Sequence, residues 1–174
     1  MLSLIENSST SRTPVYIVNL NALDQITIAG SLVAIEVVLR LAQSKGAQKA
    51  QLLRVSVPSH CALLNSVSKK ISNKMETFEF KPAKVPYIGN CRARSLRSGK
   101  EIKADLSLGI ANPVKWHEST ALIFELGARL FVEVGPGQVL ANMAQKEFSD
   151  ARVVPMYYSG FESKIILTKR EMES

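Results

Sequence analysis

The sequence contains few of the residues that cross-link small folds through disulfides or bind metals. Its 174 residues include two cysteines, Cys61 and Cys91, two histidines and one tryptophan. Two cysteines do not make a disulfide framework, and neither has the spacing of a metal ligand. We therefore predict no metal site and a reducing, cytoplasmic setting.

Long apolar runs and a recognisable leader are also missing. No apolar stretch approaches the roughly 18–20 residues that a membrane span needs. Residues 1–12, MLSLIENSSTSR, lack the basic start, long apolar middle and small-residue cleavage site of a secretory signal. We expect no membrane association.

Aromatic residues make up only 6% of the chain, whereas the net charge is +7, from 22 Lys and Arg against 15 Asp and Glu. A positive chain favours anionic partners such as a nucleic acid, a nucleotide-bearing thioester or an acidic protein. No interleaving of basic and aromatic residues suggests base stacking. The composition therefore disfavours nucleic acid and leaves the other two partners open.

The first part of the chain predicts a small α+β unit. Hydrophobic residues make up 46% of the sequence, which is typical of a globular protein. Residues 15–30 favour two strands around a polar turn from Asn21 to Gln25. A helix capped by Ser31 should follow and end at Gly46. In residues 50–57, apolar and polar side chains alternate, which predicts a strand.

The second part predicts strands that alternate with helices. After a helix capped by Ser59, we expect a short buried strand over 85–90 and a basic loop over 92–103. Helices over 100–110 and 116–128 come next, then a strand, a Gly-Pro-Gly loop, a helix and a strand up to residue 157. Residues after Ser159 show little pattern and stay unassigned. Such alternation is typical of parallel strands joined by crossover helices.

His60 is the first candidate for chemistry. It lies in LLRVSVPSHCALL, between the predicted strand and the helix that follows. Functional groups in α/β folds gather at such junctions, and the positive end of a helix dipole favours a neutral imidazole that can accept a proton. A half-buried histidine that only satisfies nearby backbone groups fits the position equally well.

The other candidates favour structural roles. His117 at a helix start suits a surface or capping residue. Cys61 has no second base nearby and suits a buried thiol. Residues 135–138, GPGQ, form a turn that lacks the spacing of a phosphate-binding motif. The chain contains no Gly-x-Ser-x-Gly, so the turn that exposes a nucleophilic serine is absent from these residues.

Four segments resemble the bacterial malonyl-CoA:acyl carrier protein transacylases in their order. VPSHCALL (57–64) is similar to the histidine segment of that family, and NLNALDQITIAG (19–30) to its Asn-x-Asn hairpin. NPVKW (112–116) and FVEVGPGQVL (131–140) are similar to its later signatures. VPYIGNCRAR and the region from NPVKW to VEVGPG most resemble a specialised member, the epsilon subunit of malonate decarboxylase.

The resemblance implies roles for five residues. The matching histidine is the family's base, which puts that role on His60. A backbone carbonyl that orients this histidine falls on Gly109, where the family often has glutamine. Asn19, Asn21 and Asn90 match positions near the catalytic cleft. The family's serine, its oxyanion-hole glutamine and its carboxylate-binding arginine match nothing in these residues.

The resemblance also implies a fold class, α/β. We expect a truncated ferredoxin-like small subdomain over 1–56 and a partial parallel sheet of the α/β-hydrolase-like large subdomain over 57–158, followed by a tail over 159–174. The boundary between the two subdomains should fall near Ser56–Ser59. The match covers the C-terminal half of the family's chain.

The implied activity moves a malonyl group from malonyl-CoA to the phosphopantetheine-type thiol of an acyl carrier protein, with no bound cofactor. The expected partners are the coenzyme A thioester, the carrier protein and a separate N-terminal half. With no serine in these residues, the chain should be inactive alone. An alternative is a non-catalytic remnant or interaction module of a broken transacylase gene.

Overall fold

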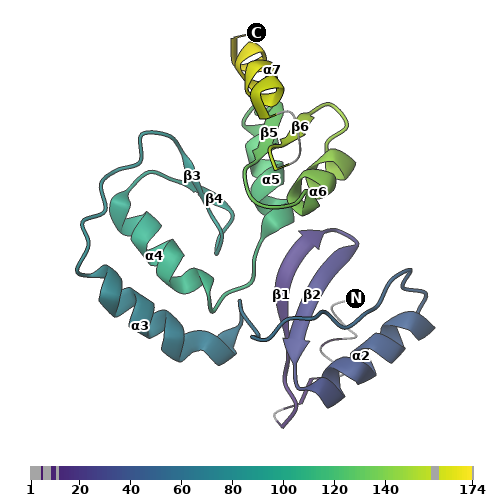
Figure 1. The fold of residues 1–174 in the computed structure, drawn as a ribbon. Coiled ribbons are helices and arrows are strands. Elements are labelled where there is room, and N and C mark those ends of the chain that lie inside the picture. Colours follow the sequence, from purple (N-terminus) through teal and green to yellow (C-terminus); the bar gives the residue numbers. More distant parts are fainter. Residues whose placement is uncertain (1–4, 6–8, 11, 158–160, 174) are drawn as a thin grey trace. The chain divides into compact units, whose positions relative to one another are not determined.

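The structure is a computed structural model that describes residues 5, 9–10, 12–157 and 161–173. The chain divides into two compact units, Met1–Trp116 and His117–Ser174. Its sheets are small: β1 pairs with β2, β3 with β4 and β5 with β6. The predicted α/β class is confirmed, as a mixed α/β arrangement of helices with two-stranded sheets (Figure 1).

The first unit contains most of the elements. They are β1 (Val15–Ala22), β2 (Gln25–Gly30), α2 (Leu32–Ser44), the 3₁₀ turn η1 (Ala62–Leu64), α3 (Asn65–Met75), β3 (Tyr87–Gly89), β4 (Arg94–Leu96) and α4 (Gly99–Gly109). The predicted hairpin and its following helix are both confirmed, and the Ser31 hydroxyl accepts the Ala34 N–H at 3.4 Å as an N-cap.

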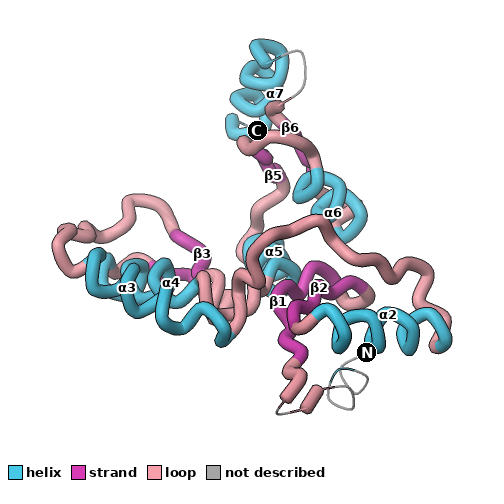
Figure 2. Tube along the Cα trace, turned by 60° about the horizontal axis from the view of Figure 1, so that its bottom comes forward, coloured by secondary structure: helices cyan, strands magenta, loops and turns pink. Residues whose placement is uncertain are grey.

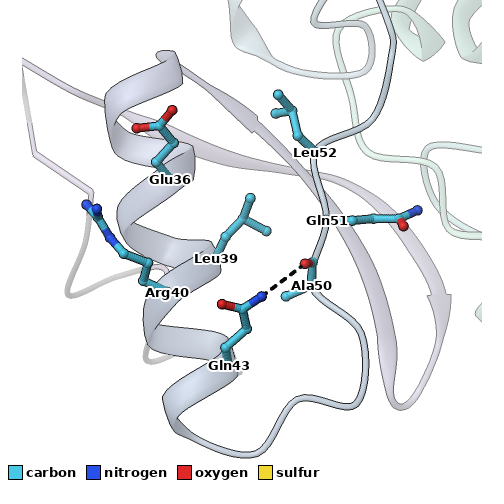
Figure 3. Close-up of a pocket in the computed structure, with 7 residues that line it drawn as sticks. All are labelled: Glu36, Leu39, Arg40, Gln43, Ala50, Gln51 and Leu52. Atoms are coloured by element: carbon cyan, nitrogen blue, oxygen red, sulfur yellow. Dashed lines mark hydrogen bonds between the residues drawn. The ribbon is translucent and has the colours of Figure 1, made fainter.

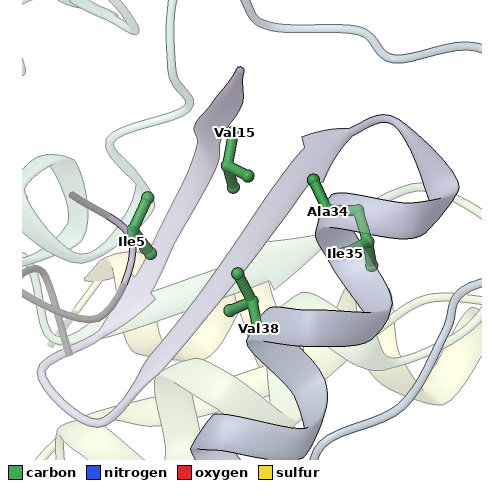
Figure 4. Close-up of a cluster of buried hydrophobic side chains, with 5 residues drawn as sticks. All are labelled: Ile5, Val15, Ala34, Ile35 and Val38. Carbon is green, nitrogen blue, oxygen red and sulfur yellow. The ribbon is translucent and has the colours of Figure 1, made fainter. Parts of the chain in front are cut away.

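The hairpin and α2 bury one apolar cluster between them. Val15 of β1 faces Ala34, Ile35 and Val38 of α2, with Ile5 alongside (Figure 4). These α2 positions recur at helical spacing, which places them on one stripe facing the hairpin. Burial of this stripe fixes α2 against the sheet.

The second unit follows from α5 (Trp116–Glu125) to β5 (Leu130–Glu133), α6 (Val139–Glu147), β6 (Arg152–Pro155) and α7 (Phe161–Glu173). β5 and β6 are parallel, as a strand–helix–strand crossover predicts. Phe148 stacks on Phe124 at 4.7 Å and on Phe131 at 5.5 Å between ring centroids. These stacked rings hold α5, α6 and β5 together.

The strand predicted over residues 50–57 is wrong. The segment is irregular, with a bend at residues 56–57, and pairs with no strand among the described residues. Leu52, Val55 and Val57 are 59%, 74% and 52% exposed. Strand propensity expresses packing against neighbouring strands, and without such a neighbour the pattern alone makes no ladder.

Four further expectations need correction. Ser59 caps no helix, because Cys61 precedes η1 and Leu64 precedes α3. The basic loop over 92–103 instead contains β4 and the first turn of α4. β3 pairs antiparallel with β4, and among the described residues only β5 and β6 form a parallel pair of strands, beside one isolated parallel bridge between Asn19 and Val114. The unassigned tail contains α7.

The chain exposes 11911 Å² of surface. Two separate folded bodies of the sizes of the two units would together expose about 10,000 Å². The chain therefore leaves more surface in water than its size requires. Among the described helices, none has the length and apolarity to cross a membrane.

Candidate functional site

His60 lies at the C-terminal end of α4, between two backbone carbonyls. Its N–H donates to the Ile110 carbonyl at 2.7 Å, and its Nδ1 lies 2.8 Å from the Gly109 carbonyl oxygen. The sequence predicted that His60 lies at the N-terminus of the helix that follows it. This is wrong, because α3 begins only at Asn65. The imidazole meets the carbonyl end of a helix instead.

The backbone of His60 is in the left-handed region, with φ of 66°. A non-glycine residue adopts this conformation only where its surroundings hold it there, at a cost on the order of 1–3 kcal/mol. Here the hydrogen bonds of His60 to the carbonyls of Gly109 and Ile110 maintain this conformation. Such strained residues cluster at functional sites.

The contact with Gly109 assigns the tautomer of the ring. A carbonyl oxygen can only accept, so Nδ1 carries the hydrogen and donates it. In the neutral imidazole, Nε2 then has a free lone pair. His60 is half-buried, and Nε2 is therefore the ring atom suited to accept a proton from an incoming hydroxyl.

A buried hydrogen bond ties the helix after His60 to the helix that supplies its acceptors. The Ser68 hydroxyl of α3 donates to the Ser107 carbonyl of α4 at 2.7 Å, and both residues are buried. α3 follows His60, and α4 ends at Gly109. This bond therefore sets the spacing between the imidazole and its carbonyl partners.

The segment from Gly109 to Val114 contacts His60, the strand around Asn19, and Asn90. Val114 bonds to β1 on either side of Asn19: its N–H donates to Val18 and its carbonyl accepts from Leu20, both at 2.8 Å. The Asn90 side chain donates to the Pro113 carbonyl at 3.2 Å. The structure thus brings His60, Gly109, Asn19 and Asn90 to one segment. No interaction among the described residues ties the Asn21 side chain to it.

A buried carboxylate fixes Asn90. Asp105 of α4 is 7% exposed and accepts from the N–H of Asn90 at 2.9 Å, the N–H of Cys91 at 3.0 Å and the hydroxyl of Tyr87 at 3.1 Å. Three donors satisfy a charge that would otherwise be costly to bury. Asp105 therefore locks the turn after β3 onto α4.

The same carboxylate shifts two neighbouring pKa values. Burial, then the hydrogen bond and charge of Asp105, raise the pKa of Tyr87 to about 12. Burial, then the charge of Asp105, raise the pKa of the Cys91 thiol to about 11. Both groups are neutral at physiological pH, so Cys91 is a poor nucleophile.

Comparison with known proteins identifies relatives of the chain. No family model matches it. The malonyl CoA-acyl carrier protein transacylase of Haemophilus influenzae is 31% identical over 137 residues, which cover 79% of this chain and 44% of that protein. The chain is related to the malonyl-CoA:acyl carrier protein transacylases. It spans less than half the length of this curated relative.

Solved transacylase structures match nearly the whole chain. That of Coxiella burnetii matches with a TM-score of 0.88 and 29% identity, over 97% of this chain and 52% of that one. A complex of a type II polyketide acyl carrier protein with its malonyl-transacylase matches at 0.87 and 28% identity, over 98% and 55%. The resemblance to the transacylases is thus confirmed, whereas these matches give no support to the malonate decarboxylase subunit in particular.

The remaining candidate residues have local contacts of their own. In the second unit, His117 Nδ1 lies 3.4 Å from Glu147 Oε1, without hydrogen-bond geometry. The Glu133 carboxylate accepts the Ala141 N–H at 2.8 Å, so the helix after the GPGQ turn already has its own anion. Cys61 is buried, and its thiol donates to the Pro58 carbonyl at 3.2 Å.

An open hollow of about 290 Å³ lies elsewhere in the first unit. The α2 side chains Glu36, Leu39, Arg40 and Gln43 line it, together with residues 50–52 (Figure 3). Within the described residues, no cluster of three metal-ligating side chains occurs. The hollow includes no residue of the His60 cluster, so we assign it no part in the chemistry.

Sequence reasoning missed Asp105 and Ser68. Asp105 shares one face of α4 with Ile102 and Gly109, three residues before it and four after it. An acidic residue within an apolar stripe is a signal that could have identified it. Ser68 gave no such signal, because a serine in mid-helix is common and its partner is a backbone carbonyl.

Proposed function

We propose that the chain is the part of a malonyl-CoA:acyl carrier protein transacylase that supplies the catalytic base. In this proposal His60 is that base, Gly109 is its orienting residue, and the nucleophilic serine comes from outside these 174 residues. The observation that carries it is the Nδ1–Gly109 contact of 2.8 Å, which leaves Nε2 free to accept a proton. Relatives named malonyl CoA-acyl carrier protein transacylases support it.

The reaction would take place in two matched steps. His60 Nε2 accepts the serine proton while the serine oxygen attacks the malonyl thioester carbonyl. The carbon–sulfur bond breaks, and the imidazolium returns the proton to the coenzyme A sulfur. The carrier thiol then attacks the malonyl ester with the same base, and the serine regains its proton. Nδ1 donates to Gly109 throughout and holds the ring in place.

The proposed fold assignment follows from the same relationship. We infer a truncated ferredoxin-like subdomain over 1–56 and part of the large transacylase subdomain over 57–158. The unpaired residues 50–57, whose sequence alternates like a strand, and the short sheets support a fold that other segments complete. Asn19, Asn21 and Asn90 would line the cleft of the completed enzyme.

A malonyl transfer assay tests the proposed function. The chain alone should transfer no measurable malonyl group from malonyl-CoA to a carrier thiol. Co-expression with the segment of the Haemophilus influenzae transacylase that the match leaves uncovered should restore transfer. His60→Ala in the restored complex should abolish it again. Robust His60-dependent transfer by the chain alone would contradict the proposal.

The second candidate is a non-catalytic interaction module. The large exposed surface favours it as much as it favours a half enzyme, because both require a partner that covers the surface. An upstream reading frame that encodes Gly-His-Ser-x-Gly would favour the enzyme. The narrower assignment to malonate decarboxylation depends on the carrier: transfer to that enzyme's modified carrier alone would support it.

A further inference from the structure

The turn between β3 and β4 is strained at a residue other than glycine. The two strands pair as far as Gly89 and Arg94, and residues 90–93 connect them. Within this turn Ala93 has φ of 45°, in the left-handed region. A non-glycine residue keeps such a conformation only where its surroundings over-determine it. The turn is therefore held by contacts from outside itself, and β3 lies beside α4 (Figure 2).

Asp105 of α4 supplies the contacts that hold this turn. Its Oδ2 accepts the Asn90 N–H at 2.9 Å, and its Oδ1 accepts the Cys91 N–H at 3.0 Å. Hydrogen bonds to an ionised acceptor are about twice as strong as bonds between neutral groups. The carboxylate uses one oxygen for each of two successive N–H groups, so it fixes the direction of the turn as well as its position.

The backbone at Gly89 leaves room for the carboxylate. A Cβ at this position would lie 2.9 Å from Asp105 Oδ1 and 2.8 Å from Leu96 Cδ1, closer than Cβ atoms approach other atoms. Gly89 has no positive φ, so the backbone conformation does not require glycine there. The missing side chain instead allows the close approach of Asp105, and the last residue before the turn is therefore fitted to this carboxylate.

The helix α4 carries both Asp105 and the acceptor of His60. Asp105 precedes Gly109 by four residues, and the Gly109 carbonyl oxygen lies 2.8 Å from His60 Nδ1. Residues four apart lie on one face of a helix, about 6 Å along its axis. α4 therefore holds the turn of Asn90 and the imidazole of His60 at a fixed separation.

The Asn90 side chain contacts the segment that begins at Gly109. Its Nδ2 donates to the Pro113 carbonyl at 3.2 Å. The next residue, Val114, bonds to β1 on either side of Asn19 through its N–H and its carbonyl, both at 2.8 Å. With Nδ2 bound to the backbone, the Asn90 amide has one orientation, and its oxygen is the atom suited to accept from a donor of a bound molecule.

We propose that Asp105 is a positioning residue, which holds the Asn90 side chain at a fixed place relative to His60. This inference rests on the proposed function, in which Asn90 lines the cleft that receives malonyl-CoA. Asp105 acts through the N–H groups of the turn and needs no contact with the substrate. The carbonyl that orients His60 belongs to the α4 backbone, so loss of the Asp105 carboxylate leaves it in place. Asp105 therefore affects the binding of malonyl-CoA rather than proton transfer by His60.

Tyr87 distinguishes this role from a contribution to stability alone. Its hydroxyl donates to Asp105 Oδ2 at 3.1 Å, but the residue belongs to β3 and lies outside the turn. Tyr87→Phe removes one of the three bonds to the carboxylate and keeps both N–H groups of the turn bound. A carboxylate that served only stability would respond to the loss of any of its donors in the same way. Tyr87→Phe is therefore the matched control.

Steady-state kinetics of the restored complex test the inference. Asp105→Asn should raise the KM for malonyl-CoA about ten-fold and leave kcat within about two-fold, because a binding group is displaced and the base is not. Tyr87→Phe should leave both constants within about two-fold. An equal rise of KM in the two variants, or a fall in kcat without a rise in KM, would overturn the inference. An unchanged KM with Asp105→Asn would overturn it as well.

A double-mutant cycle shows whether Asp105 acts through Asn90. In a chain that carries Asn90→Ala, adding Asp105→Asn should change KM by less than about two-fold, because the side chain that Asp105 positions is already removed. A rise of about ten-fold that persists in the Asn90→Ala chain would contradict the proposed route. Circular dichroism checks that each variant retains its helices. If Asp105→Asn loses them, Gly89→Ala replaces it under the same criteria, since the new Cβ displaces the carboxylate and keeps its charge.

The proposed function and the positioning role can fail separately. A restored complex that transfers no malonyl group would refute the function. The positioning role is then measured by nitrogen-15 NMR of the Asn90 side-chain amide, whose signal Asp105→Asn should shift and Tyr87→Phe should leave in place. An Asn90 signal that stays unchanged in Asp105→Asn would refute the positioning role, whether or not the complex is active.

Discussion

At the residue scale, Asp105 organises the surroundings of the site. Its carboxylate holds the N–H groups of Asn90 and Cys91 and the hydroxyl of Tyr87, and Asn90 in turn bonds to Pro113. One buried charge thus fixes a turn that would otherwise be a surface loop. Removal of the Asp105 charge should first change the pKa values of Tyr87 and Cys91, which it faces.

We predict that Asp105→Asn makes the Cys91 thiol more reactive. Burial, then the charge of Asp105, raises the pKa of this thiol from 9.0 to about 11, so the reactive thiolate is scarce at pH 9. Without the charge the pKa should fall, and alkylation by iodoacetamide at pH 9 should accelerate several-fold. Peptide mapping separates Cys91 from buried Cys61, and the urea-unfolded chain provides the reference rate. An unchanged rate at Cys91 would contradict the predicted role of Asp105.

The same shifts predict a loss of stability in alkali. The folded state favours the neutral forms of Tyr87 and Cys91, whose pKa values rise from 10.0 to about 12 and from 9.0 to about 11. Their contribution to stability is therefore complete below about pH 9 and is lost as the pH rises through the raised values. Urea titrations at pH 8 and pH 10.5 measure this loss. Asp105→Asn should flatten the dependence, and a slope that this variant leaves unchanged would count against the assignment.

At the scale of elements, the α3–α4 pair positions His60. We predict that Ser68→Ala loosens the imidazole, because the Ser68 hydroxyl supplies the bond that ties the two helices near Ser107. The matched control is Ser107→Ala, since the Ser107 hydroxyl bonds within α4 and the carbonyl used by Ser68 survives the change. Nitrogen-15 NMR of labelled histidines should show a pure Nδ1–H tautomer for His60 in the native and control chains.

In Ser68→Ala, the Nε2–H tautomer should appear at His60, while the His117 signals in the other unit stay unchanged. A variant that only loses stability would keep the His60 tautomer of its folded molecules. An Nδ1–H tautomer that persists in Ser68→Ala would therefore show that the helix tie does not position the ring.

Two glycines of α4 provide a second test of packing. Gly99→Ala should destabilise the chain by about 1–3 kcal/mol, because the new Cβ would overlap the Phe80 carbonyl oxygen. Gly109→Ala meets nothing within 4 Å and keeps the carbonyl that His60 uses, so its effect should stay within about 1 kcal/mol. Urea unfolding measures both, and equal effects would contradict the tight contact at Gly99.

Helices and strands could be predicted from the sequence where the contacts that stabilise them come from the same segment of the chain. The hairpin, α2 with its Ser31 cap and α4 follow from turn residues, caps and helical spacing within each segment. Residues 50–57 failed because a strand needs a partner strand, which no described segment supplies. His60 could be proposed from its motif, but its contacts with Gly109 and Ile110 lie 49 and 50 positions away. No local pattern could have placed the ring at the end of α4 rather than the start of α3.

At the scale of the whole molecule, the exposed surface is the dominant feature. The chain exposes 11911 Å², about 1,900 Å² more than two separate folded bodies of the sizes of its two units. Apolar side chains contribute to it, with Val55, Val85 and Val134 between 73% and 81% exposed. A surface of this kind is typical of a protein that is completed by further polypeptide.

We predict that the chain by itself is prone to aggregate and only marginally stable. It should bind a hydrophobic dye such as anilinonaphthalene sulfonate, and its thermal melt should be broad. Co-expression with the complementing transacylase segment should suppress dye binding and sharpen the melt. A clean monomer that melts cooperatively at high temperature without any partner would argue against the need for completion.

The most direct measurement is the rate at which malonyl-CoA loads the serine of the complementing segment, followed by rapid quench and mass spectrometry. With the native chain present, the serine should gain one malonyl group within the turnover time. With His60→Ala, the loading rate should fall by a factor on the order of 10⁴–10⁶, as in serine–histidine enzymes that lose one member of the pair. Loading at the same rate with either chain would show that His60 is not the base.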